Sequence, residues 1–434
     1  MSRSLNSYPE VRLGAASKTL VRPEFDLLLA CCGSRSDSRR PARIGLGLDR
    51  GPNWLEFARL TEHHAVGPLV YRALSAFSQA VPGSVFERLR RDNERNVQNS
   101  LWLARELIRI LDCLESHGVP AIPYKGPVLA KAIYGDIALR RFADLDILIR
   151  ARDLRDAKAA VGELGYTPTL GLNEAEQAAH IISGNEVPFD GPLGRRVLEL
   201  QWRVLPRFYA VEFSIENFFQ RSSLVDLGGR LVRTLAPEDL LLVLCVHAAK
   251  HVWWRLSWLC DIAETVRSQP IDYISAYRTA RELGIERIVA VNFLLQSQLF
   301  GVPSPLPFRR SMKNDDPDTE CLADVARQVL IGSSDYNFQS IEYFMVMLRL
   351  RERLQDRFRF LVRLIFTPSK GEWLTVRLPA QLFLLYRVIR VFRLVAKFLT
   401  GAFGSLGRTP FGSFRSRSVP RVAEVALEQE KKVG

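Results

Sequence analysis

The chain has 434 residues, of which 47% are hydrophobic and 25% are charged, and its formal net charge is +13. This length and balance suit two or three folded domains and exclude a largely disordered chain. The 60 basic residues are 10 Lys and 50 Arg. Such an arginine bias fits binding to phosphate groups or anionic lipid heads, although the base composition of a genome produces the same bias.

Cysteine usage and the first residues bear on the cellular compartment. The six cysteines form no Cys-x-x-Cys pair, and several lie in apolar runs, as Cys113 and Cys245 do. This pattern predicts buried free thiols in a reducing compartment rather than disulfides or a zinc site. The first thirty residues contain no continuous apolar segment before a small-residue cleavage site. No signal peptide is therefore predicted, and the cytoplasm is the expected location.

Residues 1–117 are predicted to form an N-terminal helical segment after a polar start over residues 1–20. His63 and His64 are interpreted as the end of a helix rather than as a site. Gly118 is expected to end the last and longest helix of this segment. Apolar spacing predicts helices over Arg22–Cys32, Trp54–Leu74 and Val85–His117, with a charged loop over Ser34–Arg43.

The next stretch predicts a strand, a tight turn and a helix. Val119–Tyr124 reads as a strand and Val128–Tyr134 as a helix, with Lys125, Gly126 and Pro127 between them. A glycine turn before a helix N-terminus lets backbone N–H groups approach a phosphate, and Lys125 would add a positive charge beside it. An ordinary turn is the alternative interpretation.

Two aspartates follow in an apolar context. Asp144 and Asp146 flank or enter the run 145–149, which otherwise reads as a buried strand. Because strand side chains alternate, both carboxylates point to one face, where a Mg²⁺ ion would relieve their repulsion. The alternative is a solvated pair, or one balanced by Arg140 and Arg141.

These residues together resemble a known group of proteins, the bacterial uncharacterised nucleotidyltransferases of the polymerase β-like superfamily. The resemblance implies an α/β (α+β) fold, with a polymerase β-like sheet flanked by a large helical portion. The superfamily's Gly-Ser signature is missing, because Pro127 follows Gly126, so contacts of that serine are not transferred. The matching positions are Lys125-Gly126, Leu129-Ala130, Tyr134-Gly135, Arg140 and Asp144 with Asp146.

The resemblance also implies a third carboxylate on a later strand. Arg195–Val204 alternates as a strand does, and Glu199 stands at the matching position. Three carboxylates can hold two metal ions, one on the triphosphate and one at the attacking hydroxyl. Similar proteins continue with Leu, His and Trp, whereas this chain has Gln201 in place of the histidine. A glutamate paired with a neighbouring arginine is the alternative.

From residue 237 the chain is predicted to be helical, beginning with Glu238–Lys250. The segment HAAKHVWWRLSWLCDIA, residues 247–263, resembles a second signature of the same family. The resemblance suggests that four nucleotide-binding residues close over the triphosphate and that Asp261 orients one histidine. A tryptophan-rich helix pair that caps the sheet is the alternative. The four residues are His247, Lys250, His251 and Arg255.

The C-terminal part is helical and basic. A helix pair is predicted over 271–300 and a loop over Pro303–Asp318. Residues 341–419 contain 15 basic and 4 acidic residues, which accounts for +11 of the net charge. The apolar helix predicted over Leu382–Leu399 suits the surface of an anionic membrane, or packing within its own domain. Its basic face would consist of Arg387, Arg390, Arg393 and Lys397.

The predicted organisation has five segments. They are an N-terminal helical segment (1–117), the nucleotidyltransferase core (118–236), a helical domain (237–340), a basic amphipathic helical region (341–400) and a flexible tail (401–434).

The predicted function is Mg²⁺-dependent transfer of an NMP from an NTP to a hydroxyl or phosphate acceptor. Asp144, Asp146 and Glu199 would bind metal and carry the chemistry, and Lys125, Gly126 and Arg140 would bind the nucleotide. By resemblance, the acceptor is a small molecule, a saccharide, a lipid-linked saccharide or a peptide, in surface polysaccharide or peptide-product biosynthesis. The expected location is the cytoplasm or the inner membrane face.

Three alternatives stay open. The first is a catalytically silent relative that binds nucleotides or regulates a partner. The second is a nucleic-acid-binding protein, which the sequence does not favour because it lacks a recognised nucleic-acid-reading motif. The third is a phosphotransferase that uses Lys125, which lacks support from any Walker-type or kinase-type loop.

Overall fold

The computed structural model describes residues 22–34, 37–192, 194–312, 316–332, 336–338, 340–368, 378, 382 and 385–394. The chain divides into two units at residues 391 and 392, and the first unit, Met1–Val391, contains all the helices and strands labelled below. The predicted polar start (1–20) and the predicted flexible tail (401–434) lie outside the described residues.

The N-terminal segment is helical, as predicted. The long helix α5 ends at Ser116, close to Gly118. The charged loop predicted over Ser34–Arg43 is shorter than expected, because α2 already begins at Arg40. The helices are α1 (Pro23–Cys32), α2 (Arg40–Asp49), α3 (Trp54–His63), α4 (Gly67–Leu74), the 3₁₀ helix η1 (Ser75–Ala80) and α5 (Gly83–Ser116).

A five-stranded mixed sheet occupies the middle of the chain. Its strand order is β1-β2-β5-β4-β3, and β2 and β5 run parallel while the other neighbours are antiparallel. The strands are β1 (Ile122–Pro123), β2 (Leu145–Leu148), β3 (Thr167–Pro168), β4 (Glu186–Asp190) and β5 (Arg196–Gln201). The helices between them are α6 (Gly126–Tyr134), η2 (Ile137–Leu139), η3 (Ala151–Asp153), α7 (Leu154–Glu163) and α8 (Glu174–Ser183).

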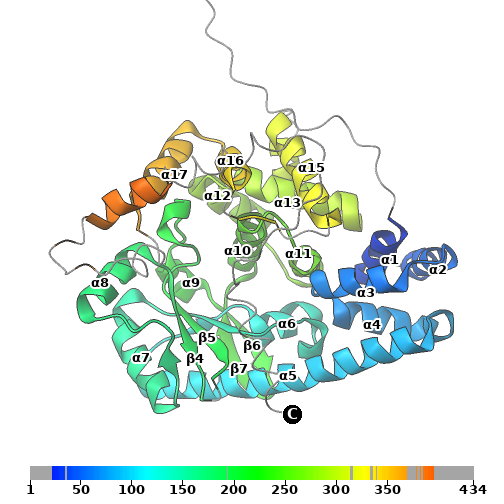
Figure 1. The fold of residues 1–434 in the computed structure, drawn as a ribbon, viewed down its shortest axis with the longest axis horizontal. Coiled ribbons are helices and arrows are strands. Elements are labelled where there is room, and N and C mark those ends of the chain that lie inside the picture. The colour runs from blue at the N-terminus through cyan, green and yellow to red at the C-terminus, as the bar shows by residue number, and fades with distance from the viewer. Residues whose placement is uncertain are drawn as a thin grey trace, which may run out of the picture. The chain divides into compact units, whose positions relative to one another are not determined.

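The two faces of the sheet contact different cores. Leu145 and Ile147 of β2 are buried among side chains of α5 and α7, whereas Leu148 belongs to a core shared with the N-terminal and C-terminal helices. Figure 1 shows α5 along one side of the sheet and α10 on the other. Because side chains alternate, Asp146 projects from the same face as Leu148. This face is directed toward the helices of residues 237–366, called the helical half below.

A β-hairpin joins the sheet to the helical half. It consists of β6 (Ser223–Leu227) and β7 (Arg230–Thr234), and the Thr234 hydroxyl donates to the carbonyl of Pro123 in β1 at 2.9 Å. The elements before it are η4 (Arg207–Tyr209) and α9 (Ile215–Arg221).

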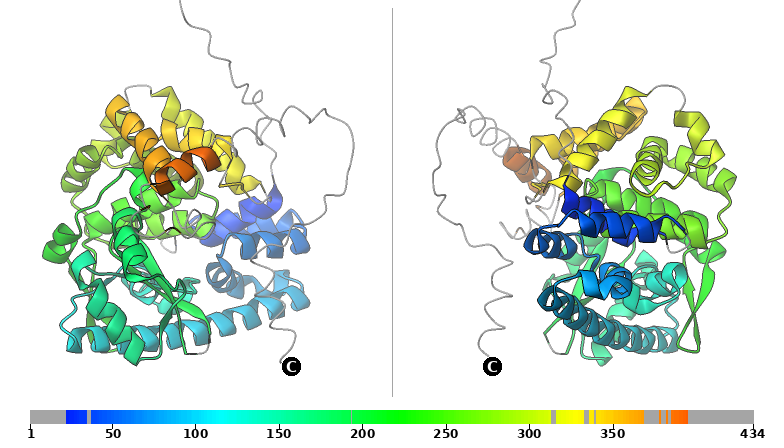
Figure 2. Two further views of the ribbon diagram at one scale, coloured as in Figure 1. Left: turned by 60° about the vertical axis from the view of Figure 1, so that its left-hand side comes forward. Right: turned by 90° about the vertical axis from the view of Figure 1, so that its right-hand side faces the viewer.

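The helical half packs against the N-terminal helices in one core (Figure 2). The predicted loop over Pro303–Asp318 is wrong in two places, because α14 lies within it and α15 begins at Pro317, where proline suits a helix start. The helices are α10 (Pro237–Lys250), α11 (Leu256–Ser268), α12 (Tyr273–Leu283), α13 (Glu286–Phe300), α14 (Leu306–Met312), α15 (Pro317–Ile331), α16 (Ile341–Arg349) and α17 (Leu354–Phe366).

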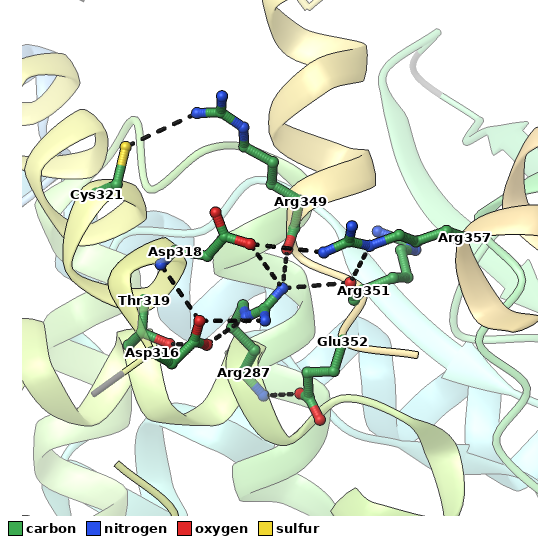
Figure 3. Close-up of polar contacts among 9 residues, drawn as sticks. All are labelled: Arg287, Asp316, Asp318, Thr319, Cys321, Arg349, Arg351, Glu352 and Arg357. Carbon is green, nitrogen blue, oxygen red and sulfur yellow. Dashed lines mark hydrogen bonds and ion pairs between the residues drawn. The ribbon is translucent and has the colours of Figure 1, made fainter. Parts of the chain in front are cut away.

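The guanidinium of Arg287 connects three parts of the helical half (Figure 3). It donates to Asp316 at 2.6 Å, before α15, and to the carbonyl of Arg349 at 2.5 Å, at the end of α16. The Arg287 residue is only 9% exposed. A buried guanidinium needs these hydrogen-bond partners, so the contacts are expected to matter for stability.

The cysteines are free thiols, as predicted. Four of the six are buried, and Cys113 and Cys321 are half-buried. Among the described residues, no helix has both the length and the apolar composition needed to cross a membrane.

We predict that Arg287→Ala lowers the free energy of unfolding by about 1–3 kcal/mol, because the hydrogen bonds of a buried guanidinium to Asp316 and to the Arg349 carbonyl are lost. Chemical denaturation measures this change. The control is Arg327→Ala, which removes an exposed i,i+3 pair with Asp324 and should cost less than about 1 kcal/mol. Equal losses in the two variants would contradict the assignment.

Candidate active site

The turn between β1 and α6 brings a helix N-terminus to the aspartate pair. Lys125 precedes the helix, and Gly126 has a φ of +62°, a left-handed conformation that favours glycine. A Cβ atom at Gly126 would lie 3.2 Å from the carbonyl oxygen of Asp144. The predicted strand, turn and helix are therefore present, and glycine is needed both for the backbone angle and for the close approach.

The structure brings the three predicted carboxylates together. Asp144 directly precedes β2 and is exposed, while Asp146 is buried within the strand. Asp146 and Glu199 are register partners across the parallel pair β2 and β5. Neighbouring residues on adjacent strands share a face, so Asp144, Asp146 and Glu199 all project from the sheet toward the helical half.

A hydrogen-bond network holds two of these carboxylates. The side-chain amide of Gln201 donates from Nε2 to Asp146 Oδ1 at 2.8 Å and to Glu199 Oε2 at 3.0 Å. Its Oε1 accepts from the Tyr124 hydroxyl at 2.6 Å, and Lys125 Nζ lies 3.4 Å from Asp146 Oδ1. Sequence reasoning noted Gln201 only as a departure from the family pattern and missed Tyr124. Gln201 lies two residues after Glu199 on the same strand, and this spacing could have predicted that both side chains project from one face.

The charges at this site shift the pKa values of its groups. Burial, followed by repulsion from Glu186 and Asp146, raises the pKa of Glu199 to about 7. Burial alone would lower the pKa of Lys125, but attraction to Asp146 and other negative groups raises it above its ordinary value. Lys125 is therefore protonated at neutral pH, whereas Glu199 exchanges a proton there.

Glu186 is a fourth acid at this site, and sequence reasoning missed it. It begins β4, is the register partner of Gln201, and accepts from the side-chain amide of Asn185 at 2.7 Å. Glu186 also attracts Lys250 at the end of α10, although burial lowers the pKa of that lysine overall. The sequence alone does not show that β4 lies beside β5 in the sheet. Glu186 could therefore be placed near Glu199 only from the strand order of the structure.

The two predicted histidines lie together on α10. The rings of His247 and His251 are 4.9 Å apart, and both contact Trp258, at 5.2 and 5.0 Å. Burial and then the charge of Lys125 lower the pKa of His247 well below its ordinary value, and burial lowers that of His251 to about 3. Both side chains are neutral at pH 7 and contact an indole ring.

Arg140 forms an ion pair with Asp261 in the interior of the protein. Its Nε donates to Asp261 Oδ2 at 2.9 Å, and the Tyr134 hydroxyl donates to Oδ1 at 3.0 Å. The expectation that Asp261 orients a histidine is therefore not what the structure shows. The aspartate instead neutralises a buried arginine and connects α11 to α6 and to the loop before β2.

A groove of about 1310 Å³ lies next to the segment that precedes Asp144 in the chain. It begins at Phe142 and Ala143 and extends between α3 and α5. Several arginines line it, and some are paired: Arg88 and Arg141 lie 3.8 and 3.6 Å from Glu62. The groove is therefore arginine-rich and reaches the residues directly before Asp144, while Asp144, Asp146 and Glu199 are not among its lining residues.

A strained turn places Trp254 and Arg255 in the groove. Val252 and Trp253 both have a φ of 50°, which is unfavourable for side chains of their shape. Trp253 is fully buried and donates to Asn292 Oδ1 at 2.8 Å, which holds the turn in place. Arg255 Nε and Trp254 Nε1 are buried and have no hydrogen-bond partner among the described residues.

His63 and His64 form a helix end, as predicted. The helix α3 ends at His63, and His64 Nδ1 accepts from the backbone amide of Leu256 at 3.2 Å. His63 also lines the groove and contacts the Trp254 ring at 4.8 Å. His64 therefore joins α3 to the strained turn, and His63 forms part of the groove wall.

The fold is α+β, and the glycine turn and helix after the first strand of its mixed sheet are what the resemblance to the class of nucleotidyltransferases implies. The chain belongs to a particular family within that class, the uncharacterised nucleotidyltransferases, whose model matches residues 50–301. The resemblance inferred from the sequence motifs is confirmed by this match.

A solved structure gives a more distant similarity. It is the solution structure of the antibiotic-resistance factor ANT(2'')-Ia, which is 16% identical over 45% of this chain and 91% of that chain, with a TM-score of 0.26. No curated protein matches the sequence.

We predict that Glu199→Gln stabilises the protein much more at pH 8 than at pH 5. The folded pKa of about 7 exceeds the ordinary value of 4.5. Ionisation therefore opposes folding, with no cost below pH 4.5 and the full cost above pH 7. The expected gain at pH 8 is about 1–3 kcal/mol in the free energy of unfolding.

Denaturant titration at the two pH values measures this effect, and Glu282→Gln on exposed α12 is the control. A gain of equal size at pH 5 and pH 8 would show that charge repulsion at Glu199 is not the cause.

Proposed function

We propose that the chain is a Mg²⁺-dependent nucleotidyltransferase that moves an NMP from an NTP to a hydroxyl or phosphate acceptor. The observation that carries this proposal is the register of β2 and β5, which sets Asp146 beside Glu199 while Asp144 precedes them on the same face. Family membership supports nucleotidyl transfer as the reaction class.

The donor groups fit a divalent cation. Asp144, Asp146 and Glu199 offer carboxylate oxygens, which are the ligands that Mg²⁺ prefers. Both hydrogen bonds to Asp146 from described residues go to Oδ1, so Oδ2 remains available for coordination. A bound ion would neutralise phosphate charge and lower the pKa of the attacking hydroxyl.

The chain's own residues would hold and orient the NTP. Lys125 and the backbone N–H groups at the start of α6 suit the β- and γ-phosphates, because a helix N-terminus and an ammonium both favour anions. Lys250 and Arg255 approach from the helical half, where His247 and His251 would line the site as neutral groups. Arg140, paired with Asp261, would act on the nucleotide through its charge and through the position of Asp144.

Glu199 is the proposed general base. A carboxylate with a pKa of about 7 can accept a proton from the acceptor hydroxyl at neutral pH. Positioning the acceptor beside the α-phosphate would supply much of the rate. The arginine-rich groove next to the segment that precedes Asp144 is the proposed route of entry for substrates, with the donors of Trp254 and Arg255 at its end.

The acceptor class follows from the sequence resemblance. It comprises small molecules, saccharides, lipid-linked saccharides and peptides, in the biosynthesis of surface polysaccharides or peptide products. The proposed location is the cytoplasm, with attachment to the inner membrane face where the acceptor is carried on a lipid.

We expect Asp146→Asn to reduce nucleotidyl transfer by at least about a thousandfold, because a metal ligand is lost while the side-chain shape is kept. Asp144→Asn should behave in the same way. Release of pyrophosphate from NTPs with Mg²⁺ and a panel of acceptors measures the rate.

The control for this pair is Asp156→Asn, at an exposed position on α7, which should retain the wild-type rate. Thermal unfolding with NTP, with and without Mg²⁺, shows whether each variant still folds and binds. Normal transfer by both Asp144→Asn and Asp146→Asn would end the proposal.

The affinity for Mg²⁺ should fall as the pH drops below 7. Protonated Glu199 cannot ligate a cation, and its pKa is about 7. Calorimetric titration at pH 6 and pH 8 measures the difference. Glu199→Gln should bind more weakly and with a smaller dependence on pH. A wild-type affinity that is the same at both pH values would remove Glu199 from the metal site.

A further inference from the structure

Helix α17 exposes a continuous apolar face. At 100° per residue, five large hydrophobic side chains fall within about 100° of its circumference. Leu354 is 79% exposed and Phe358 is 71% exposed. Isolated exposed hydrophobic residues are ordinary, whereas a contiguous apolar surface indicates a contact with something other than water. The α17 apolar face consists of Leu354, Phe358, Leu361, Val362 and Ile365, all exposed.

The opposite side of α17 faces the protein and carries both polar and buried apolar side chains. Arg357 donates to the carbonyl of Arg351 at 2.8 Å and lies 3.5 Å from Asp318, as Figure 3 shows. Arg363 donates to Glu212 at 2.5 Å, and Phe360 is buried. These contacts fix the rotation of the helix about its axis. The apolar face therefore cannot turn inward without breaking them.

The next described helical residues are attached to α17 and expose further apolar side chains. In residues 385–391, Tyr386 and Arg390 are buried, and Arg390 Nε donates to the carbonyl of Leu364 in α17 at 2.7 Å. Leu385 and Val388 are 44% and 48% exposed. The predicted basic face of this segment is thus wrong for Arg390, which is buried and attaches the segment to α17. Positions 395–399 lie outside the described residues.

We propose that the α17 apolar face is a docking surface for an anionic lipid bilayer. Phe, Leu and Ile side chains on one side of a helix insert at the boundary between headgroups and acyl chains. Arg359, which follows Phe358 and lies 3.6 Å from Asp356, and Arg387 are exposed and would meet anionic headgroups. The inference is independent of the proposed transfer reaction.

The charge of this region favours a bilayer over a second copy of the chain or a nucleic acid as the partner of the α17 apolar face. The described residues 341–368 and 385–394 contain nine arginines and three acidic residues. A second copy of the chain, docked by the same face, would bring the same positive charge to the interface and repel. Nucleic acid would match the charge but would leave the five apolar side chains in water. An anionic bilayer satisfies both the apolar surface and the cations.

The test is flotation of the full chain with vesicles of phosphatidylglycerol and phosphatidylcholine, and with vesicles of phosphatidylcholine alone. We expect wild-type protein to float with the anionic vesicles and to be released as salt rises. The variant Phe358→Ser with Ile365→Ser should bind about tenfold more weakly, because two inserted side chains are lost. The control is Ile274→Ser, at a position 65% exposed on α12, which should bind within about twofold of wild type.

Both substituted positions are exposed, so thermal unfolding of the double variant should match that of wild type, and sedimentation should show a monomer in each case. Three outcomes would overturn the inference. Wild-type protein could fail to float with anionic vesicles at low salt, or the double variant could float as well as wild type. The third is a wild-type dimer that the double variant dissociates, which would assign the face to a second copy.

Discussion

The site depends on one unfavourable contact, the placement of two carboxylates side by side on parallel strands. The register of β2 and β5 fixes Asp146 opposite Glu199, and like charges at this separation repel unless positive charge or a donor lies between them. The chain supplies both, through Lys125 and through the amide of Gln201. What remains is an excess of negative charge that a divalent cation would balance.

The helical half completes the site from the other side. α10 contributes Lys250 near Glu186 and Glu199, and α11 contributes Asp261, which holds Arg140 behind Asp144. Between these two helices, the strained turn directs Trp254 and Arg255 into the groove. Strain of this kind persists only where surrounding packing enforces it, and here the buried indole of Trp253 does so.

Local patterns were sufficient for much of the fold. Alternation around Asp144 and Asp146 gave their common face, and the Lys125-Gly126-Pro127 turn gave the strand and helix on either side. Contacts between distant segments were not accessible in this way. Glu186 approaches Glu199 only because of strand order, and Arg140 meets Asp261 across 121 residues of sequence. Arg390 looked exposed by helical periodicity, but tertiary packing buries it against α17.

Gln201 also makes the hydrogen bonding between the two carboxylates independent of pH. An amide nitrogen carries two N–H donors at every pH, so one side chain can hold both Asp146 and Glu199 without gaining or losing a proton. A histidine, which the resemblance implies at this position, could donate from both ring nitrogens only when protonated. In this chain the amide that holds the carboxylate pair is therefore insensitive to pH, whereas Glu199, the carboxylate that is proposed to react, exchanges a proton near neutral pH.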